Sequence, residues 1–311
     1  MMDCTDKFYR YMARRLSKHA YLYTEMVHTG AILRGDRDRF LSFDETEHPI
    51  ALQLGGSDAK ALAESTQIAQ EWGYNEVNLN VGCPSDRVQS GFFGACLMAK
   101  PDLVNDCLQA MSKDVDIPVT VKTRIGIDDL DSWDYFRSFI DSLANGGCKV
   151  FLIHARKAWL NGLSPKENRT IPPLNYEWVY KIKEEFPELE FSLNGGVTTI
   201  EGAQEHLKYV DGVMIGREAY SNPWVLTDID SKIYGGAQLK LSRVELAHEL
   251  NPFILHQLEL GHPLNRILRH SLGLFHGIRG GRAFRRSLTE NMTKKGADLS
   301  VWTQALTLIE E

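Results

Sequence analysis

Seven short apolar runs, separated by stretches with helical periodicity, constrain the fold of this 311-residue chain more than any other feature. Each run has about the length of a buried parallel strand and is rich in β-branched or aromatic residues. The runs are residues 21–26, 50–54, 76–80, 119–124, 150–154, 190–194 and 212–216. The helical stretches are residues 58–72, 103–113, 133–144, 176–186 and 199–207, the last with a predicted capping box in Thr198 and Glu201. Strands that alternate with helices predict βαβ units and a parallel sheet.

Polar and charged side chains gather at the carboxyl ends of these runs. They are Gln53, Asn78, Asn80, Lys122, Arg124, His154, Arg156, Asn194 and Arg217. A (β/α)8 barrel keeps its active site at the carboxyl ends of its strands, so the pattern predicts an α/β fold of the TIM-barrel type. The alternative is an open, doubly wound sheet.

The chain begins with a helical pattern that no apolar run precedes. This first helix carries Phe8, Met12 and Leu16 on one face. Each helix of a (β/α)8 barrel follows a strand, so we expect the first barrel strand to be largely missing from this chain. Its loss would leave the strands at 21–26 and 212–216 with open edges.

Beyond residue 236 the strand runs stop and only helical patterns follow. They cover residues 244–259, 263–277, 281–292 and about 299–309. We therefore expect two domains, a barrel over residues 1–236 and a C-terminal all-helical domain over residues 237–311.

Composition narrows the function classes. The chain has five cysteines and none of them forms a CxxC pair, which argues against a disulfide framework, a zinc site or an iron–sulfur cluster. No apolar run approaches about 18 residues, and the N-terminus has no apolar signal region, so we expect a cytoplasmic protein without a membrane span. The net charge of −6 means that any binding of nucleic acid must come from a local patch.

Two glycine signals follow the last two strand runs: Asn194-Gly195-Gly196 and Gly216-Arg217. Glycines allow backbone N–H groups to approach a phosphate, and the loops after strands seven and eight are the usual phosphate site of such barrels. Either signal alone is more simply a turn of the chain. Together they favour a cofactor that carries a phosphate.

Lys122, His154 and Gln53 lie at or near the carboxyl ends of three different strand runs and should face the same mouth of the barrel. A buried lysine could hold the negative charge that develops on a reduced flavin ring, and a glutamine could bind the ring edge. Taken singly, Lys122 is equally well a lysine that reaches for water, and His154 a hydrogen-bonded core histidine.

Cys83 lies in Asn80-Val81-Gly82-Cys83-Pro84, directly after a strand run and at the same mouth. That position suits a nucleophile or a general acid. Most lone cysteines are small buried hydrophobes. Cys96, among small apolar neighbours at the start of a predicted helix, fits this simpler interpretation, whereas Cys83 does not.

The helical tail is strongly basic. Between Arg266 and Lys295 there are eight lysines and arginines and one acidic residue, Glu290, a net charge of +7. A second basic stretch follows the fifth run and contains Arg156, Lys157, Lys166 and Arg169. A solvated helix face rarely has so few acids, so we interpret the tail as a surface for RNA.

Five segments together resemble the tRNA-dihydrouridine synthase family, most closely its DusA-type subfamily. They are EVNLNVGCPSDRVQSGFFGACLM, VTVKTRIGID, LIHARKAWLNGLSPKENR, SLNGG and GVMIGR, in the family's order and spread over nearly the whole chain. The resemblance implies an FMN-bound barrel and a C-terminal helical domain. We also expect the protein to be a monomer without a bound metal. The resemblance further implies NADPH-dependent reduction of uridine to dihydrouridine in the tRNA D-loop, at U20 and U20a.

The resemblance also implies individual roles. The cysteine of the family's GCP motif falls on Cys83, which would give a proton to C5 of the uracil after FMN gives a hydride to C6. The methionine of the family's Ala-Pro-Met falls on Met1. The implied flavin contacts are Met1, Met2, Gln53, Lys122, His154, Asn194, Gly195, Gly196, Gly216 and Arg217. The expected tRNA contacts are Asn80, Arg156, Lys166, Arg169, Arg282, Arg285 and Arg286.

Two other classes remain open at this point. A flavin barrel that reduces free pyrimidines, such as a dihydroorotate dehydrogenase, would share the cofactor but would not need the basic tail. A non-catalytic tRNA-binding protein would keep the tail but would have no reason to hold Cys83, Lys122 and His154 together.

Overall fold

The computed structural model describes residues 1–310, apart from the side chains of Asp86 and Arg87. The chain forms two compact units. The barrel unit consists of Tyr21–Phe43 and His48–Ile215. The helical unit consists of Met1–Ala20, Asp44–Glu47 and the chain from Gly216 onward. The domain division between residues 236 and 237 stays a prediction.

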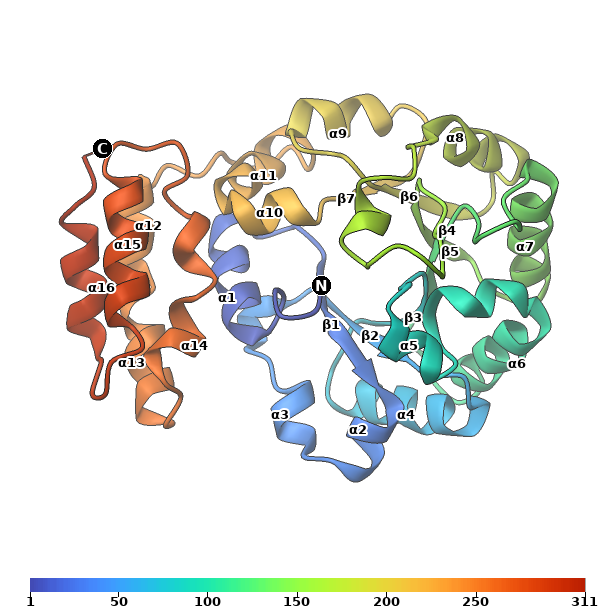
Figure 1. Ribbon diagram of the computed structural model, residues 1–311, viewed down its shortest axis with the longest axis horizontal. Helices are drawn as coiled ribbons and strands as arrows, with labels where there is room; N and C mark the ends of the chain where they lie inside the picture. The colour runs from blue at the N-terminus through green and yellow to red at the C-terminus, as the bar shows by residue number, and fades with distance from the viewer. Residues whose placement is uncertain (311) are drawn as a thin grey trace. The chain divides into compact units, whose positions relative to one another are not determined.

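The barrel unit is built on one curled parallel sheet (Figure 1). Its strands are β1 (Leu22–His28), β2 (Ile50–Gly55), β3 (Glu76–Val81), β4 (Val119–Arg124), β5 (Val150–His154), β6 (Glu190–Asn194) and β7 (Gly212–Met214). All seven predicted strands are confirmed, with β7 shorter than predicted.

The strand order β1-β2-β3-β4-β5-β6-β7 follows the sequence, as in a barrel. A doubly wound sheet would reverse its order at a switch point, so that alternative is wrong. The TIM-barrel fold class is confirmed by this half-barrel. Among the described residues β1 and β7 are the end strands, and the missing first strand stays a prediction.

The long helices of the barrel unit cover the outer side of the sheet (Figure 1). The helices are α2 (Thr29–Arg34), α3 (Arg37–Leu41), α4 (Ala59–Glu71), α5 (Asp86–Ser90), α6 (Pro101–Ser112), α7 (Trp133–Asn145), α8 (Tyr176–Glu185) and α9 (Ile200–His206), with 3-10 turns η2 (Gly94–Ala99) and η3 (Glu167–Arg169). The five predicted barrel helices are confirmed. The predicted capping box is wrong: the N-cap of α9 is Thr199, whose hydroxyl accepts from the Gly202 amide at 3.0 Å, so Glu201 is one position short of the place that a capping box needs.

The inner and outer faces of the sheet differ in polarity, as β3 shows. Successive side chains of a strand point to opposite faces. Val77, Leu79 and Val81 share one face, and all three are fully buried. Glu76, Asn78 and Asn80 share the other face and bond to polar side chains of neighbouring strands. The interior of this barrel is therefore polar and hydrogen-bonded rather than filled with aliphatic residues alone.

The helical unit contains the N-terminal helix and the whole tail. Its elements are α1 (Lys7–Leu16), η1 (Glu45–Glu47), α10 (Arg217–Ser221), η4 (Pro223–Asp228), α11 (Ile229–Lys232), α12 (Arg243–Glu249), α13 (Asn251–Glu259), α14 (Leu264–Leu268), η5 (Ser271–Gly273), α15 (Gly281–Asn291) and α16 (Leu299–Leu306). The amphipathic first helix is confirmed, because Phe8, Met12 and Leu16 are all at most 3% exposed. No helix within residues 1–310 has the length and apolar character to cross a membrane.

Two tail helices were predicted too long. The stretch 244–259 is divided into α12 and α13, with Leu250 between them. Pro252 explains the break, since it has no N–H to donate and its ring clashes with the carbonyl four residues earlier. The stretch 263–277 contains only α14 and the turn η5. There, a Cβ on Gly273 would lie 2.4 Å from the Ser221 carbonyl oxygen, so the chain packs too closely for another residue type.

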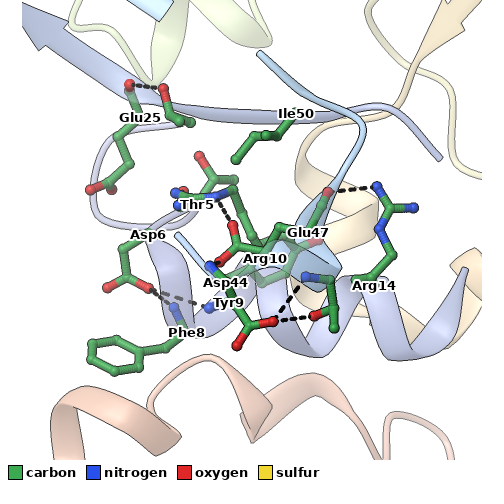
Figure 2. Close-up of polar contacts among 12 residues, drawn as sticks. Thr5, Asp6, Phe8, Tyr9, Arg10, Arg14, Glu25, Asp44, Glu47 and Ile50 are labelled. Atoms are coloured by element: carbon green, nitrogen blue, oxygen red, sulfur yellow. Dashed lines mark hydrogen bonds and ion pairs between the residues drawn. The ribbon is translucent and has the colours of Figure 1, made fainter. Parts of the chain in front are cut away.

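Two buried arginines anchor α1 within the helical unit (Figure 2). Arg10 donates from Nε to Oε2 of Glu47 at 2.6 Å, and both side chains are almost fully buried. Arg14 donates to the carbonyl oxygens of Ser17, Ala20 and Glu47. The Arg14 bonds satisfy backbone carbonyl groups that burial would otherwise leave unpaired.

Candidate active site and RNA-contacting residues

The strand register brings five predicted site residues to the carboxyl-end rim of the barrel unit. Asn80 of β3 lies opposite Lys122 of β4, and His154 of β5 lies opposite Asn194 of β6. Gln53 comes from β2, the strand beside β3. In a parallel sheet the carboxyl ends of neighbouring strands meet at one edge. The structure thus groups side chains that are more than 140 residues apart in the chain, from Gln53 to Asn194.

A chain of hydrogen bonds runs through the barrel interior toward this rim. Thr120 donates to Glu76 at 2.5 Å, and Asn78 donates to Thr120 at 2.8 Å. The side chain of Gln53 donates to the Asn78 side-chain oxygen at 2.9 Å, and the side chain of Asn80 donates to Oε1 of Gln53 at 2.8 Å. Burial raises the pKa of Glu76. Because each amide uses a defined donor and acceptor, the network fixes the orientation of Gln53 and Asn80.

Asn80 also fixes the backbone that carries Cys83. Its side-chain oxygen accepts from the amides of Gly82 at 3.1 Å and Cys83 at 2.9 Å. Asn80 is only 8% exposed. The carbonyl of Cys83 in turn accepts from the Ala95 amide at 2.9 Å. The predicted proton donor therefore sits on a segment with little freedom to move.

The two cysteines of this region have different surroundings. The half-buried thiol of Cys83 lies 3.7 Å from the Ser85 hydroxyl, on the loop that follows β3. The Cys96 thiol donates to the carbonyl of Phe93 at 3.2 Å, and burial raises its pKa. Cys96 begins no α-helix, since it lies within the 3-10 turn η2, and it is half-buried rather than fully buried.

Lys122 is the group with the most perturbed charge at the rim. Burial first, and then the nearby positive charge of Arg124, lowers the pKa of Lys122 to about 7. Among the side chains that the structure describes, its ammonium has no hydrogen-bond or ion-pair partner. A half-buried lysine of this kind gains its full charge when an anionic group binds beside it. Lys122 therefore fits a ligand that carries or develops negative charge.

Gly195 and Gly196 form a concave backbone segment directly after β6. Their φ angles are +119° and +74°. A Cβ on Gly195 would lie 2.8 Å from the His154 ring, and a Cβ on Gly196 would lie 2.7 Å from both Leu174 and the Tyr176 hydroxyl. The Tyr176 hydroxyl also donates to the Gly195 carbonyl at 2.7 Å. Within residues 1–310 the two glycine amides have no hydrogen-bond acceptor, so they are available to an anion such as a phosphate.

Four of the predicted cofactor residues belong to the helical unit. Met1 and Met2 are exposed at the start of the chain. A Cβ on Gly216 would lie 3.5 Å from the Met1 sulfur, so these two residues lie side by side. Arg217 is exposed and begins α10, a helix of five residues. Their contact with a cofactor stays a prediction.

The predicted RNA contacts of the barrel unit lie on the β5–α8 loop, residues 155–175. Lys166 and Arg169 are exposed, whereas Arg156 is half-buried and donates to the backbone carbonyls of Thr170 and Pro172. Asn168 is fully buried within the loop. It bonds to the amide and carbonyl of Trp159 and to the carbonyl of Leu163. This long loop is therefore internally ordered.

Three predicted RNA contacts lie on α15 in the helical unit; we call them the α15 arginines. They are Arg282, Arg285 and Arg286. Two of them, Arg282 and Arg285, line a cavity of about 360 Å³ near the start of α15. Arg286 is exposed and forms an ion pair with Glu290 at 2.8 Å.

Sequence reasoning assigned no contact to several polar residues that shape the site, although it placed Asn78 and Arg124 at the carboxyl ends of strand runs. The residues are Asn78, Gln89, Thr120, Arg124 and Asn168. A signal existed for Arg124, because it stands two positions after Lys122 in β4 and so shares its face. Asn78, Thr120 and Gln89 bond to residues 25 to 71 positions away, which the sequence pattern does not reveal. No cluster of three potential metal ligands occurs among the described residues.

Comparison with known proteins identifies the family. The family model described as dihydrouridine synthase (Dus) matches residues 1–310. The chain belongs to the dihydrouridine synthase family. Enzymes of this family are flavin-dependent oxidoreductases, and a flavin cofactor suits both Lys122 and the concave backbone segment at Gly195 and Gly196.

Individual relatives of the dihydrouridine synthase family are similar over nearly the whole chain. A protein of Shewanella oneidensis is 56% identical over 301 residues, which cover 97% of this chain and 90% of the relative. A protein of Escherichia coli strain K12 is 54% identical over 312 residues, covering 100% and 90%. A protein of Vibrio cholerae is 55% identical over 310 residues, covering 99% and 94%. Each relative is named tRNA-dihydrouridine(20/20a) synthase.

Proposed function

We propose that this protein is an FMN-dependent tRNA-dihydrouridine synthase that uses NADPH to reduce the C5=C6 bond of uridines 20 and 20a in the tRNA D-loop. The substrate positions rest on the names of relatives that are at least 54% identical. The observation that carries the proposal is the placement of Cys83. It stands on a hydrogen-bonded segment after β3, the strand that pairs with the Lys122 strand.

The barrel unit offers a coherent set of groups for FMN. The unpaired amides of Gly195 and Gly196 suit its phosphate. Lys122 would stabilise negative charge on the flavin ring, and Gln53 offers an amide to the ring edge. His154 and Asn194 lie between these groups on β5 and β6. When it is bound and reduced, the flavin supplies the hydride that is added to C6 of the uracil.

Cys83 would act as the general acid that gives a proton to C5. Among the described residues, the one hydrogen-bond partner of its half-buried thiol is the Ser85 hydroxyl at 3.7 Å. A positioned general acid contributes about 10²- to 10⁴-fold to a rate. The bonds from Asn80 to the Gly82 and Cys83 amides would keep the thiol in place while a uracil enters.

The target uridine must leave its stacked position to reach such a site. Phosphate contacts would offset the free-energy cost of that extraction. Lys166 and Arg169 on the β5–α8 loop and the α15 arginines are the cationic groups that we expect to supply these contacts. We expect the protein to act as a monomer in the cytoplasm.

The test begins with the purified protein. It should be yellow, release FMN on denaturation as identified by mass spectrometry, and be reduced by NADPH faster than by NADH under anaerobic conditions. Unmodified tRNA should then gain dihydrouridine in the nuclease fragment that contains positions 20 and 20a. A protein that retains no flavin and converts no uridine, even with added FMN and NADPH, would refute the proposal.

A further inference from the structure

The backbone of residues 82–84 is held by hydrogen bonds from several other segments. Asn80 holds the amides of Gly82 and Cys83, as described above. The carbonyl of Gly82 accepts from Nε of Arg124 at 2.8 Å. The carbonyl of Pro84 accepts from the Gln89 side chain at 3.0 Å. Every backbone donor and acceptor from Gly82 to Pro84 thus has a partner, because the Ala95 amide binds the carbonyl of Cys83.

Two of these partners also hold the β5–α8 loop. Nη1 of Arg124 donates to the carbonyls of Lys157 and Asn168, each at 3.1 Å. The side-chain amide of Gln89 donates to the carbonyl of Leu160 at 2.8 Å. Arg124 and Gln89 are therefore bridges between the Cys83 segment and the loop that carries Lys166 and Arg169.

Arg124 is an unusual choice for a purely structural link. It is only 3% exposed, and among the described residues the partners of its guanidinium are neutral carbonyl oxygens. Burial lowers its pKa to about 10, with Arg169 and Arg156 close enough to add repulsion. A buried charge is costly. What a guanidinium offers in return is a rigid, planar set of donors that can fix several acceptors at once.

We propose that Arg124 and Gln89 are positioning residues that tie the Cys83 segment to the β5–α8 loop, so that RNA held on the loop presents its uracil to the thiol. This inference rests on the proposed function. Neither residue is expected to touch the reacting atoms. Their effect would be to keep two separate segments in one geometry, a condition for proton transfer to a base that the loop helps to hold.

The test compares Arg124→Lys with a matched control, Arg14→Lys. Arg14 is likewise buried, at 6% exposed, and likewise donates to three backbone carbonyls, but it belongs to the helical unit. Lysine keeps the charge at both positions but cannot reproduce the rigid fork. Three readouts are measured for each variant: the rate of flavin reduction by NADPH without RNA, the single-turnover rate of dihydrouridine formation, and the melting temperature.

Arg124→Lys should slow dihydrouridine formation about 100-fold, the size of effect expected when reacting groups are misplaced by roughly 1 Å. Flavin reduction should stay within about twofold of the wild type, because neither RNA nor Cys83 takes part in it. Arg14→Lys should lower the melting temperature without a comparable loss of rate. Wild-type dihydrouridine formation in Arg124→Lys would overturn the inference, and so would an equal loss of rate in both variants.

A second measurement keeps the inference separate from the proposed function. Hydrogen exchange read by mass spectrometry should rise together in the segments 82–95 and 157–169 of Arg124→Lys, and further when Gln89→Leu is added. An increase in one segment alone would overturn the tie between them. If the wild-type protein forms no dihydrouridine, the proposed function fails, yet the exchange result still decides whether the two segments are tied.

Discussion

Gly94 should be indispensable for placing Cys83. Its φ of +76° is in the left-handed region, and a Cβ there would lie 2.6 Å from the Cys83 carbonyl oxygen and 2.4 Å from a methyl group of Val88. An ordinary contact begins at 3.4 Å, so Gly94→Ala would have to push the Cys83 carbonyl from 2.6 Å to at least that distance. The carbonyl also accepts from the Ala95 amide, a bond that such a movement would stretch.

The expected magnitude has two parts. The left-handed conformation costs a residue with a Cβ about 1–2 kcal/mol, and overpacking costs about 1–3 kcal/mol more. The free energy of unfolding should thus fall by roughly 2–5 kcal/mol if the strain is not relieved. If the loop moves to relieve it, the thiol moves too, and the rate should fall by about 100-fold.

The assay is single-turnover dihydrouridine formation beside urea unfolding, with Gly147→Ala as control. Gly147 also has a positive φ, +108°, but nothing lies within 4 Å of its Cβ position. The control should therefore lose only the stability that the left-handed conformation costs, about 1–2 kcal/mol, and should form dihydrouridine at the wild-type rate. If Gly94→Ala converts uridine as fast as Gly147→Ala does, the claim that a fixed Cys83 segment matters for catalysis is wrong.

Three further predictions concern charge. The pKa of Lys122 is lowered to about 7 in the folded protein, so the unfolded state binds more protons between about pH 7 and pH 10, and the flavin-free protein should become more stable as pH rises through that window. The urea midpoint of the wild type should therefore rise more steeply with pH than that of Lys122→Met, and equal pH dependence would contradict this prediction. Glu47→Ala should cost about 3–5 kcal/mol of unfolding free energy, because it leaves the buried charge of Arg10 without its carboxylate partner. Glu249→Ala, which breaks an exposed pair, should cost about 1 kcal/mol or less, and similar losses in the two variants would contradict the role of the buried pair. Changing all three α15 arginines to Gln should weaken the salt dependence of tRNA binding: the slope of the logarithm of the binding constant against the logarithm of salt concentration should fall by about one unit per lost phosphate contact. The flavin content should stay unchanged, and an unaltered slope would place the RNA elsewhere.

The barrel could be predicted because its signals are local. Each strand is a short apolar run, and most runs have a polar residue at or near the carboxyl end, a pattern that can be read without knowing what the strand packs against. The errors arose where one residue overrides a periodic pattern. Pro252 divides a stretch whose apolar periodicity continues through it, and Thr199 rather than Thr198 caps α9 because the first helical turn begins one residue later.

The site could be predicted only in part. Cys83, Lys122 and the glycine pair stand out because they lie together at the strand ends, where their combined chemistry suits a phosphate-bearing cofactor and a proton donor. The partners that fix them do not stand out, because they act through backbone groups of distant segments. Arg124 binds the carbonyl of Gly82, 42 positions away, and Gln89 binds that of Leu160, 71 positions away. Asn80, predicted as an RNA contact, has its side-chain oxygen occupied by two amides of the Cys83 segment.

Separate replacement of Cys83 and Cys96 by alanine tests the central claim, that Cys83 is the proton donor, most directly. Cys83→Ala and Cys96→Ala should both retain flavin, be reduced by NADPH at the wild-type rate and bind tRNA. Cys83→Ala should form dihydrouridine about 10²- to 10⁴-fold more slowly, since the proton for C5 is lost while hydride delivery is intact. Cys96→Ala should be close to wild type, because the Cys96 thiol donates to the Phe93 carbonyl and is not the predicted proton donor. A Cys83→Ala enzyme as fast as Cys96→Ala would contradict the assignment of Cys83 as the proton donor.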